Sequence, residues 1–211
     1  IYFTDTGNYR IRKIADSDHN HIVSTFAGSM DTIGDGGAAA SATLCLPGAL
    51  AFDSSNNLLI VDQGNRRIRR VNASDGKIET IIGTGWPDDM GEDGDDATSS
   101  AIKRPSGIAV DSSNTVYFTD HSQNSVYKIS SDDNKVYHVA GYGSKSPVGD
   151  GGLATAAGMK KPFGLAVDSI GNLYISEHGT EIIRNVKATG YTSKKYNRKI
   201  NSETCDRGDH M

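Results

Sequence analysis

The sequence is poor in several residue types, and each scarcity excludes a class of protein. No apolar run approaches the ~20 residues of a membrane-spanning helix, so we expect no insertion into a membrane. Hydrophobic residues make up 36% and aromatic residues 7%, which is low for a compact α/β domain but suits short strands. The formal net charge of −4 disfavours binding to nucleic acid or to an anionic membrane.

Cysteine is also scarce, and the two cysteines do not define a disulfide framework. Cys45 and Cys205 lie far apart, so a disulfide and two free thiols both remain open. The chain has no secretory signal and starts at Ile1, from which we expect it to be part of a longer protein. Asn72-Ala73-Ser74 is an acceptor sequence in a predicted turn, which favours glycosylation at Asn72 and an extracellular or cell-surface location.

The sequence is rich in glycine, with 24 residues, and in internal repetition. Four segments align without gaps at spacings of 57, 58 and 57 residues: 1–14, 58–71, 116–129 and 173–186. A second motif keeps the same phase, with a proline, a small residue and a final Asp, at 47–53, 105–111 and 162–168. Repetition at a fixed period predicts a repeat architecture in which equivalent units stack.

Each period predicts four short strands, a to d, that run antiparallel. In one copy they are 108–110, Val116–Thr119, Ser125–Ile129 and Lys135–Ala140, separated by turns rich in Asp, Asn and Gly. A helical solenoid would need apolar residues three and four positions apart, and that spacing is absent. Four antiparallel strands in tandem copies are typical of a propeller blade.

These segments resemble NHL repeats. The resemblance is carried by Gly-Asn-x-Arg-Ile-Arg-Lys-Ile, Asn-x-Leu-Tyr-Ile and Pro-x-Gly-Leu-Ala-Val-Asp, and it covers residues 1 to about 186. A further repeated motif, Gly-Asp-Gly-Gly in 34–37 and 149–152 and diverged in 92–96, resembles the long-loop NHL subclass found in many secreted or surface proteins. The resemblance implies an all-β propeller of four-stranded antiparallel blades. We expect blade units at 1–33, 47–91, 105–148 and 162–200, with 187–211 as a degenerate last strand, linker or tail.

The predicted blades do not close a ring, because the sequence holds three to four of them and the first lacks its inner strand. Propellers close with four to eight blades, and we expect six here. An incomplete ring leaves exposed edges that pair with other chains. The ring can be completed in three ways: by further blades outside this sequence, by self-association of two chains or, least favoured, by a strand supplied by 187–211.

One end of the propeller is predicted to form the binding face. The turn between strands b and c lies at the same end as the connection from strand d to the next strand a, so the Gly-Asp-Gly-Gly loops should gather there. The candidate residues on this face are Asp35, Asp62, Gln63, Asp93, Asp120, His121, Asp150, Glu177 and His178.

Each group of candidates also has a structural interpretation. The acid that ends strand b recurs in every copy, which favours a role in capping the turn over a ligand role. His121 and His178 break the repeat, but an ordinary surface position is favoured over a metal site. Calcium at the acidic loops is conceivable, although glycines in tight turns explain the motif without an ion, and no cofactor is expected. The weak metal candidates are Asp93, Asp95, His121 and His178.

Two function classes follow, with a third in reserve. The first is a non-enzymatic binding, adhesion or scaffold module for a protein or glycan ligand. The second is a metal-dependent hydrolase or lyase of the lactonase or amidating-lyase type, although the positions that hold metal-binding histidines in that lyase pattern are Gly48, Ser106 and Phe163 here. RNA binding, which some NHL propellers show, ranks last because stacking aromatics among the arginines are scarce.

Overall fold

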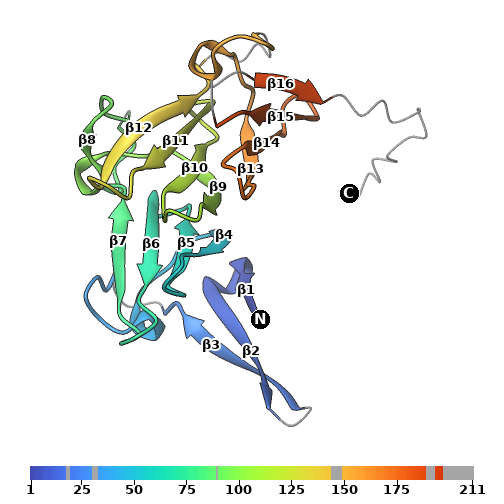
Figure 1. The fold of residues 1–211 in the computed structure, drawn as a ribbon. Helices are drawn as coiled ribbons and strands as arrows, with labels where there is room; N and C mark the ends of the chain where they lie inside the picture. The colour runs from blue at the N-terminus through green and yellow to red at the C-terminus, as the bar shows by residue number, and fades with distance from the viewer. Residues whose placement is uncertain (18–19, 30–32, 89, 144–148, 189–192, 197–211) are drawn as a thin grey trace, which may run out of the picture.

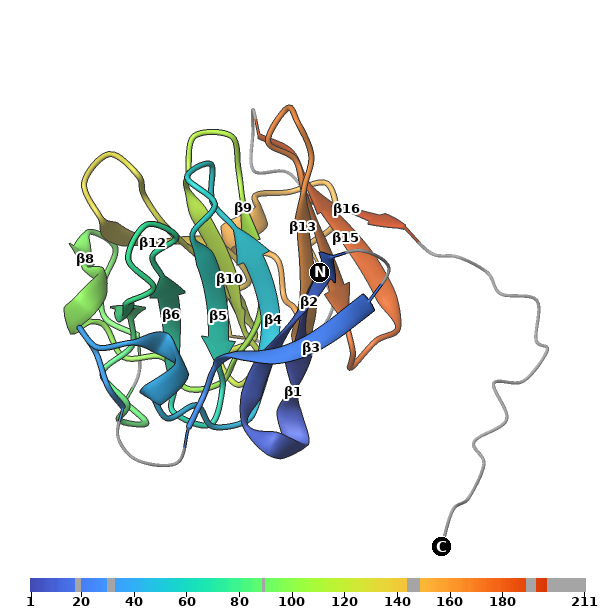
Figure 2. The same ribbon diagram turned by 90° about the horizontal axis from the view of Figure 1, so that it is seen from below.

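The computed structural model describes residues 1–17, 20–29, 33–88, 90–143, 149–188 and 193–196. They form an all-β propeller segment of four sheets that stand side by side around a common axis (Figures 1 and 2). We call the sheets the first to fourth blades, in chain order. The first blade contains β1 (Tyr2–Asp5), β2 (Arg10–Ser17) and β3 (Asn20–Ala27). The second contains β4 (Pro47–Phe52), β5 (Leu58–Asp62), β6 (Arg67–Val71) and β7 (Ile78–Ile82).

The third and fourth blades repeat this plan. The third contains β9 (Pro105–Val110), β10 (Val116–Asp120), β11 (Ser125–Ile129) and β12 (Lys135–Ala140), with the short β8 (Asp95–Asp96) added at its outer edge. The fourth contains β13 (Pro162–Val167), β14 (Leu173–Glu177), β15 (Ile182–Val186) and β16 (Ser193–Tyr196). Neighbouring strands are antiparallel throughout, as the four-stranded repeat predicts.

The hydrophobic core lies between the blades rather than inside any one of them. Alternate side chains of β5 point to opposite faces of the sheet. Leu58 and Ile60 pack toward the first blade with Ile11, while Leu59 and Val61 pack toward the third blade with Phe118. Both faces of the second blade are therefore covered, which is why every residue of β5 is buried.

The long connections between blades follow the outer edge of the next blade. The amide of Gly36 donates to the carbonyl of Ile78 at 2.8 Å, and the amide of Ile78 donates to Gly37 at 3.0 Å. In the third blade the same connection forms β8, which pairs with β12. The loop at 34–37 and the diverged loop at 92–96 thus pair with outer strands. We expected these loops to gather at the b–c end, the end that holds the turn between strands b and c.

A glycine after the last strand of a blade allows the chain to pass close to the b–c turn. Gly83 adopts a φ of +104°, and a Cβ there would lie 2.2 Å from the carbonyl oxygen of Arg66. Gly28 and Gly141 have the same geometry against Tyr9 and Asn124. Only glycine combines this φ with this contact. This explains why a glycine ends the last strand segment in each of the three copies, at 24–28, 79–83 and 137–141.

The outward faces of the first and fourth blades are open among the described residues. Leu59 and Ile68 of the second blade are 1% and 0% exposed, because the third blade covers them. Their equivalents in the fourth blade, Tyr174 and Ile183, are 38% and 50% exposed. On the opposite side, Phe3 of β1 is exposed where the equivalent Ile60 is fully buried. Both open faces carry the side chains of an interface between blades.

Candidate functional site

The inner strands of the second, third and fourth blades surround a cavity of about 540 Å³ at the b–c end. We call it the axial cavity; its polar and aromatic lining includes Thr6, Gln63, Arg104, Ser106, His121 and Phe163. The strands β4, β9 and β13 are terminal strands of their sheets, so they turn an unpaired backbone edge toward the axis. β9 and β13 approach so closely that a Cβ on Gly107 would lie 2.2 Å from the carbonyl oxygen of Phe163.

The residue that follows strand b reaches across to the next blade. Thr6 donates from Oγ1 to the carbonyl of Pro47 at 2.8 Å, and Gln63 donates from Nε2 to the carbonyl of Pro105 at 3.0 Å. At the third blade the equivalent carbonyl, that of Pro162, accepts from Ser106 Oγ at 3.3 Å instead. In the two preceding copies, the residue at the position of His121 therefore forms a hydrogen bond to the next blade.

His121 instead faces an aromatic ring, together with His178. The ring centroid of Phe163 lies 6.5 Å from that of His121 and 6.3 Å from that of His178, both in edge-on geometry. Burial lowers the pKa of His121 below its ordinary value, and the positive charges of Arg104 and Lys161 act in the same direction. The structure thus brings together two predicted candidates, His121 and His178, around Phe163.

The buried acid at the end of strand b fixes the residues before the next inner strand. Asp120 Oδ2 accepts from the amides of Lys103 at 2.7 Å and of Arg104 at 3.2 Å, while Oδ1 accepts from Ser122 and Gln123 in the turn. Asp62 accepts likewise from the amide of Cys45 and Glu177 from that of Lys160. The carboxylate of Asp120 is fully buried, and it affects the axial cavity by holding the backbone of Arg104, which lines the cavity.

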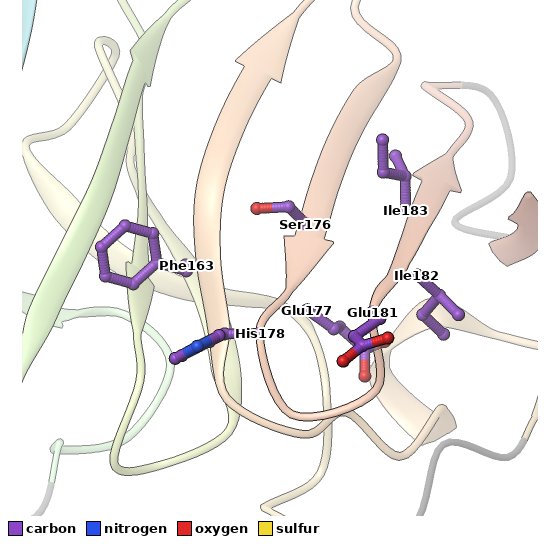
Figure 3. Close-up of a pocket in the computed structure, with 7 residues that line it drawn as sticks. All are labelled: Phe163, Ser176, Glu177, His178, Glu181, Ile182 and Ile183. Carbon is purple, nitrogen blue, oxygen red and sulfur yellow. The ribbon is translucent and has the colours of Figure 1, made fainter. Parts of the chain in front are cut away.

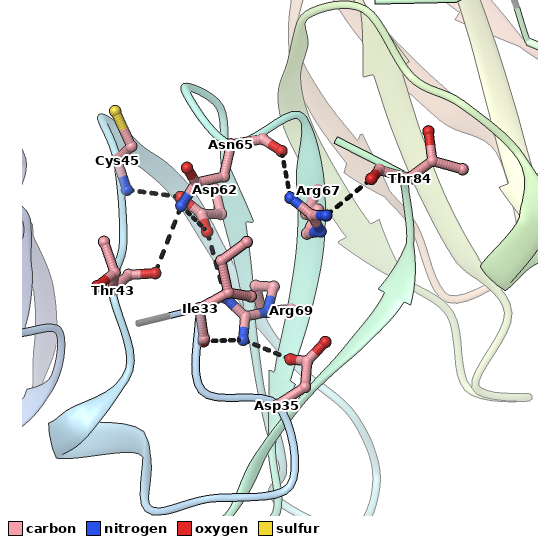
Figure 4. Close-up of polar contacts among 9 residues, drawn as sticks. All are labelled: Ile33, Asp35, Thr43, Cys45, Asp62, Asn65, Arg67, Arg69 and Thr84. Atoms are coloured by element: carbon pink, nitrogen blue, oxygen red, sulfur yellow. Dashed lines mark hydrogen bonds and ion pairs between the residues drawn. The ribbon is translucent and has the colours of Figure 1, made fainter. Parts of the chain in front are cut away.

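A buried arginine links two other candidates in the second blade (Figure 4). Arg69, which is fully buried in β6, contacts Asp62 at 3.4 Å and pairs with Asp35 of the Gly-Asp-Gly-Gly loop. Burial raises the pKa of Asp62, although the amide of Cys45, Asn65 and Arg69 all favour its charged form. These ion pairs fasten the loop to the blade, and we call them the tether. Asp35 and Asp62 thus both have a partner inside the protein.

The fourth blade has the same tether, whereas the third blade replaces it. Arg184 pairs with Glu177 and with Asp150, 3.0 Å away. In the third blade the arginine position holds Tyr127, whose hydroxyl donates to Gln123. Asp93 there accepts from the amide of His138 at 2.6 Å. Asp95, another acid of this loop, accepts from the amide of Glu92 at 2.9 Å.

The metal and modification candidates are placed as follows. Among the described residues, no group of three or more His, Cys, Asp or Glu side chains lies close enough to hold a metal ion. Asn72 accepts at Oδ1 from the amide and the hydroxyl of Ser74, both at 2.8 Å, in a turn at the end opposite the axial cavity. Cys205 lies outside the described residues, so a disulfide with Cys45 and two free thiols both stay open.

A second cavity of about 390 Å³ opens on the outward face of the fourth blade (Figure 3). Phe163 and His178 lie on its inner side, and Glu181, Ile182 and Ile183 lie along β15 and the turn before it. Because an equivalent face is covered in the second and third blades, this hollow belongs to the open interface described above. Phe163 lines both cavities and thus separates the interface from the axis.

Sequence reasoning missed Arg104 and Phe163 as residues of this site. Phe163 was noted only as a position without a metal-binding histidine. A signal for both was present: the residues that flank the proline of strand a are Leu46 and Gly48, then Arg104 and Ser106, then Lys161 and Phe163. This position varies within an otherwise regular repeat, as does the position of His121.

Comparisons with known proteins identify the fold but no family. No family model matches the sequence, and no curated protein matches it. Among solved structures, an auxiliary nutrient binding protein from Bacteroides ovatus superimposes with a TM-score of 0.62 at 17% identity, over 93% of this chain and 45% of that chain. Virginiamycin B lyase from Staphylococcus aureus gives 0.59 at 15%, over 95% and 52%. A nidogen/laminin complex gives 0.60 at 16%, over 92% and 60%.

This chain therefore spans about half the length of the structures it resembles. These structures are β-propellers, and the likeness establishes the propeller fold for the present chain. Identities of this size establish nothing beyond the fold. No helix among the described residues is long and apolar enough to cross a membrane.

Loss of the buried tether should destabilise the protein much more than loss of its exposed counterpart. We expect Arg69→Leu to lower the free energy of unfolding by about 3 kcal/mol, because it leaves the buried Asp62 without its cation. Arg12→Leu removes the equivalent arginine of the first blade, where the side chains of Arg12 and Asp5 are 24% and 25% exposed. That loss should stay below about 1 kcal/mol. Urea denaturation measures both, and equal losses would contradict the role of the tether.

The pH dependence of stability should report His121. The pKa of His121 is lowered in the folded chain, so the unfolded chain takes up this proton first, and stability falls as pH drops through its ordinary value of 6.5. His121→Gln copies Gln63 of the second blade and should remove this loss while allowing donation to Pro162. We expect the difference in unfolding free energy between about pH 7.5 and about pH 5.5 to shrink in the variant. An unchanged difference would show that His121 does not titrate in this way.

Proposed function

We propose that the chain is a non-enzymatic binding module that takes a protein or glycan ligand at the axial cavity. One observation carries this proposal. Residues that recur across the blades are used internally, for packing and for tethers, whereas several residues that break the repeat meet at one place. His121, Phe163 and Arg104 all line the axial cavity, and a repeat scaffold needs none of them for stacking.

The comparisons support a binding role as an analogy between folds. The Bacteroides ovatus structure is described as a nutrient binding protein, and the nidogen structure is a complex with laminin. Both show that a propeller of this shape serves recognition in other proteins. Within the proposal, the chain is an NHL-type propeller of the long-loop subclass. Its proposed location is extracellular or at the cell surface, where Asn72 would be open to glycosylation.

A metal-dependent lyase or lactonase is the alternative function. Virginiamycin B lyase and a putative gluconolactonase share the fold at 15% identity each. In this chain the positions beside the proline of strand a hold Gly48, Ser106 and Phe163, which offer no imidazole. Hydrolysis of D-glucono-1,5-lactone above the spontaneous rate, with Ca²⁺ or Zn²⁺ added, would favour this alternative.

Self-association is the corresponding proposal for the two open faces. The outward face of the fourth blade carries Tyr174 and Ile183, and the outward face of the first blade carries Phe3. In the second and third blades, equivalent faces cover each other, so a second copy placed head to tail would bury both. Such a pair would extend the ring by further blades of the same kind.

Filling the axial cavity should abolish binding without harming the fold. Gly48 lines the cavity, and a Cβ there would meet its nearest atoms at an ordinary 3.9 Å. The fourth blade already holds Phe163 at this position, so Gly48→Phe copies a residue that the repeat accepts. We expect its unfolding free energy to stay within about 0.5 kcal/mol of that of the parent chain.

The readout is an NMR screen of mono- and disaccharides and dipeptides against the ¹⁵N-labelled chain. Bound fragments should shift the amides of Gly107 and His121 in the parent chain and should leave Gly48→Phe unchanged. Ser131→Phe adds the same ring to an exposed turn at the far end and serves as the control. Fragments that bind Gly48→Phe as well as the parent chain would contradict the proposal.

A further inference from the structure

The charge of the axial cavity is opposite in sign to that of the chain. The formal net charge of the chain is −4. Among the described residues that line the cavity, Arg104 carries a positive charge, His121 can acquire one, and none is acidic. Lys161 adds a positive charge near His121, and this charge acts with that of Arg104 to lower the pKa of His121. A net acidic protein thus presents a basic mouth to its axis.

Two carboxylates close to these cations, those of Asp120 and Glu177, already have partners for their oxygens. Asp120 is fully buried and accepts from the backbone amides of Lys103, Arg104, Ser122 and Gln123. Glu177 pairs with Arg184 and accepts from the amide of Lys160 and the hydroxyl of Thr180. The structure shows no ion pair for the side chains of Arg104 and Lys161 within the described part of the chain. Asp120 holds the backbone amide of Arg104, and Asn124 holds that of Lys161, so neither contact occupies the charged end of the side chain.

The cavity also provides an apolar wall and backbone hydrogen-bonding groups. The ring of Phe163 is about half exposed and stands between the two imidazoles. The inner edges of β4, β9 and β13 face the axis, and the carbonyls of Pro47, Pro105 and Pro162 on them each accept from one side chain and keep a second lone pair. A ligand with a ring-sized body could therefore contact Phe163 and form hydrogen bonds to the strand edges, while an anionic group on it meets Arg104.

We infer that the axial cavity binds a compact organic anion, a carboxylate or phosphate carried on a body the size of a sugar ring. Arg104 pairs with the anionic group, Phe163 contacts the ring, and Lys161 adds charge from the rim. This inference rests on the proposed binding function and specifies the chemistry of its ligand. The positions of Arg104 and Lys161 are set by backbone bonds, to Asp120 and to Asn124 respectively, and therefore do not depend on the ligand.

Three matched probes test this inference: D-glucuronate, D-glucose 6-phosphate and D-glucose. They share a ring, and differ in carrying a carboxylate, a phosphate or no charge. NMR titration at millimolar concentration should show that at least one anion binds at Gly107 and His121 at least about tenfold more tightly than glucose. The tighter of the two anions identifies the charged group. Binding should also weaken as salt is added, because the contact is between charges.

Two variants assign the charge contact. Arg104→Gln should weaken anion binding by about tenfold or more and leave glucose unaffected. Lys187→Gln removes an exposed cation at the opposite end and should change nothing. The bound anion should also raise the NMR-measured pKa of His121, which the charges of Arg104 and Lys161 lower and the charge of Asp120 raises. If Arg104 had only a structural role, adding the anion would not raise the pKa of His121.

The outcomes separate the inference from the proposal beneath it. If glucose binds at the cavity as tightly as the anions, the choice of an anion is overturned while the binding function stands. If Arg104→Gln binds both anions unchanged, the role of Arg104 is overturned. If neither anion perturbs the residues of the axial cavity, the inference fails, and the fragment screen with Gly48→Phe still decides the proposed function by itself.

Discussion

The structure depends on one constraint: a sheet of four short strands cannot bury its two faces alone. Side chains alternate across each strand, so half of the apolar residues of a blade point forward and half point backward. Leu59 and Val61 find their partners in the third blade, and Leu58 and Ile60 find theirs in the first. Each blade is thus completed by its neighbours, which is the physical reason for a repeat with a fixed period.

The same constraint divides the polar residues into two sets. Acids recur at the end of strand b, and arginines recur in strand c of every blade except the third. They fasten the long loops of the second and fourth blades, as Arg69 does with Asp62 and Asp35. The second set departs from the repeat. His121 stands where the first and second blades have a residue that forms a hydrogen bond to the next blade, and Phe163 stands where the second and third blades have a small residue. Both line the axial cavity. Departure from symmetry therefore indicates the site more clearly than the abundance of charge does.

Much of the fold could be predicted from the sequence, because its strands follow local patterns. The predicted strands Ser125–Ile129 and Lys135–Ala140 are the observed β11 and β12. The course of the loops could not be predicted in the same way, because their partners lie far along the chain. Gly36 pairs with Ile78 in β7, and the strands β4, β5 and β6 lie between them in the sequence. The partner of Asp35 was visible in principle. Among the three blades whose preceding loop is in the sequence, the two with an arginine in strand c, Arg69 and Arg184, have loops that read Gly-Asp-Gly-Gly, and the blade with Tyr127 has the diverged loop.

The candidate site was predicted only in part, for a related reason. His121 and His178 stood out because they break the repeat, and the structure places both beside Phe163. Asp62, Asp120 and Glu177 were selected for their charge, but burial and internal partners decide what a carboxylate can do. Those properties arise from the packing of neighbouring blades and the backbone amides that converge on each acid, and a one-dimensional pattern does not contain them.

The most direct test of this account compares one residue in a covered and in an open interface. Ile68 and Ile183 occupy the same repeat position and are 0% and 50% exposed. The account predicts that Ile68→Ala lowers the free energy of unfolding by about 3 kcal/mol, and that Ile183→Ala lowers it by less than about 1 kcal/mol, in urea denaturation of the same chain. Equal losses at the two positions would contradict the claim that stacking between blades holds the structure together.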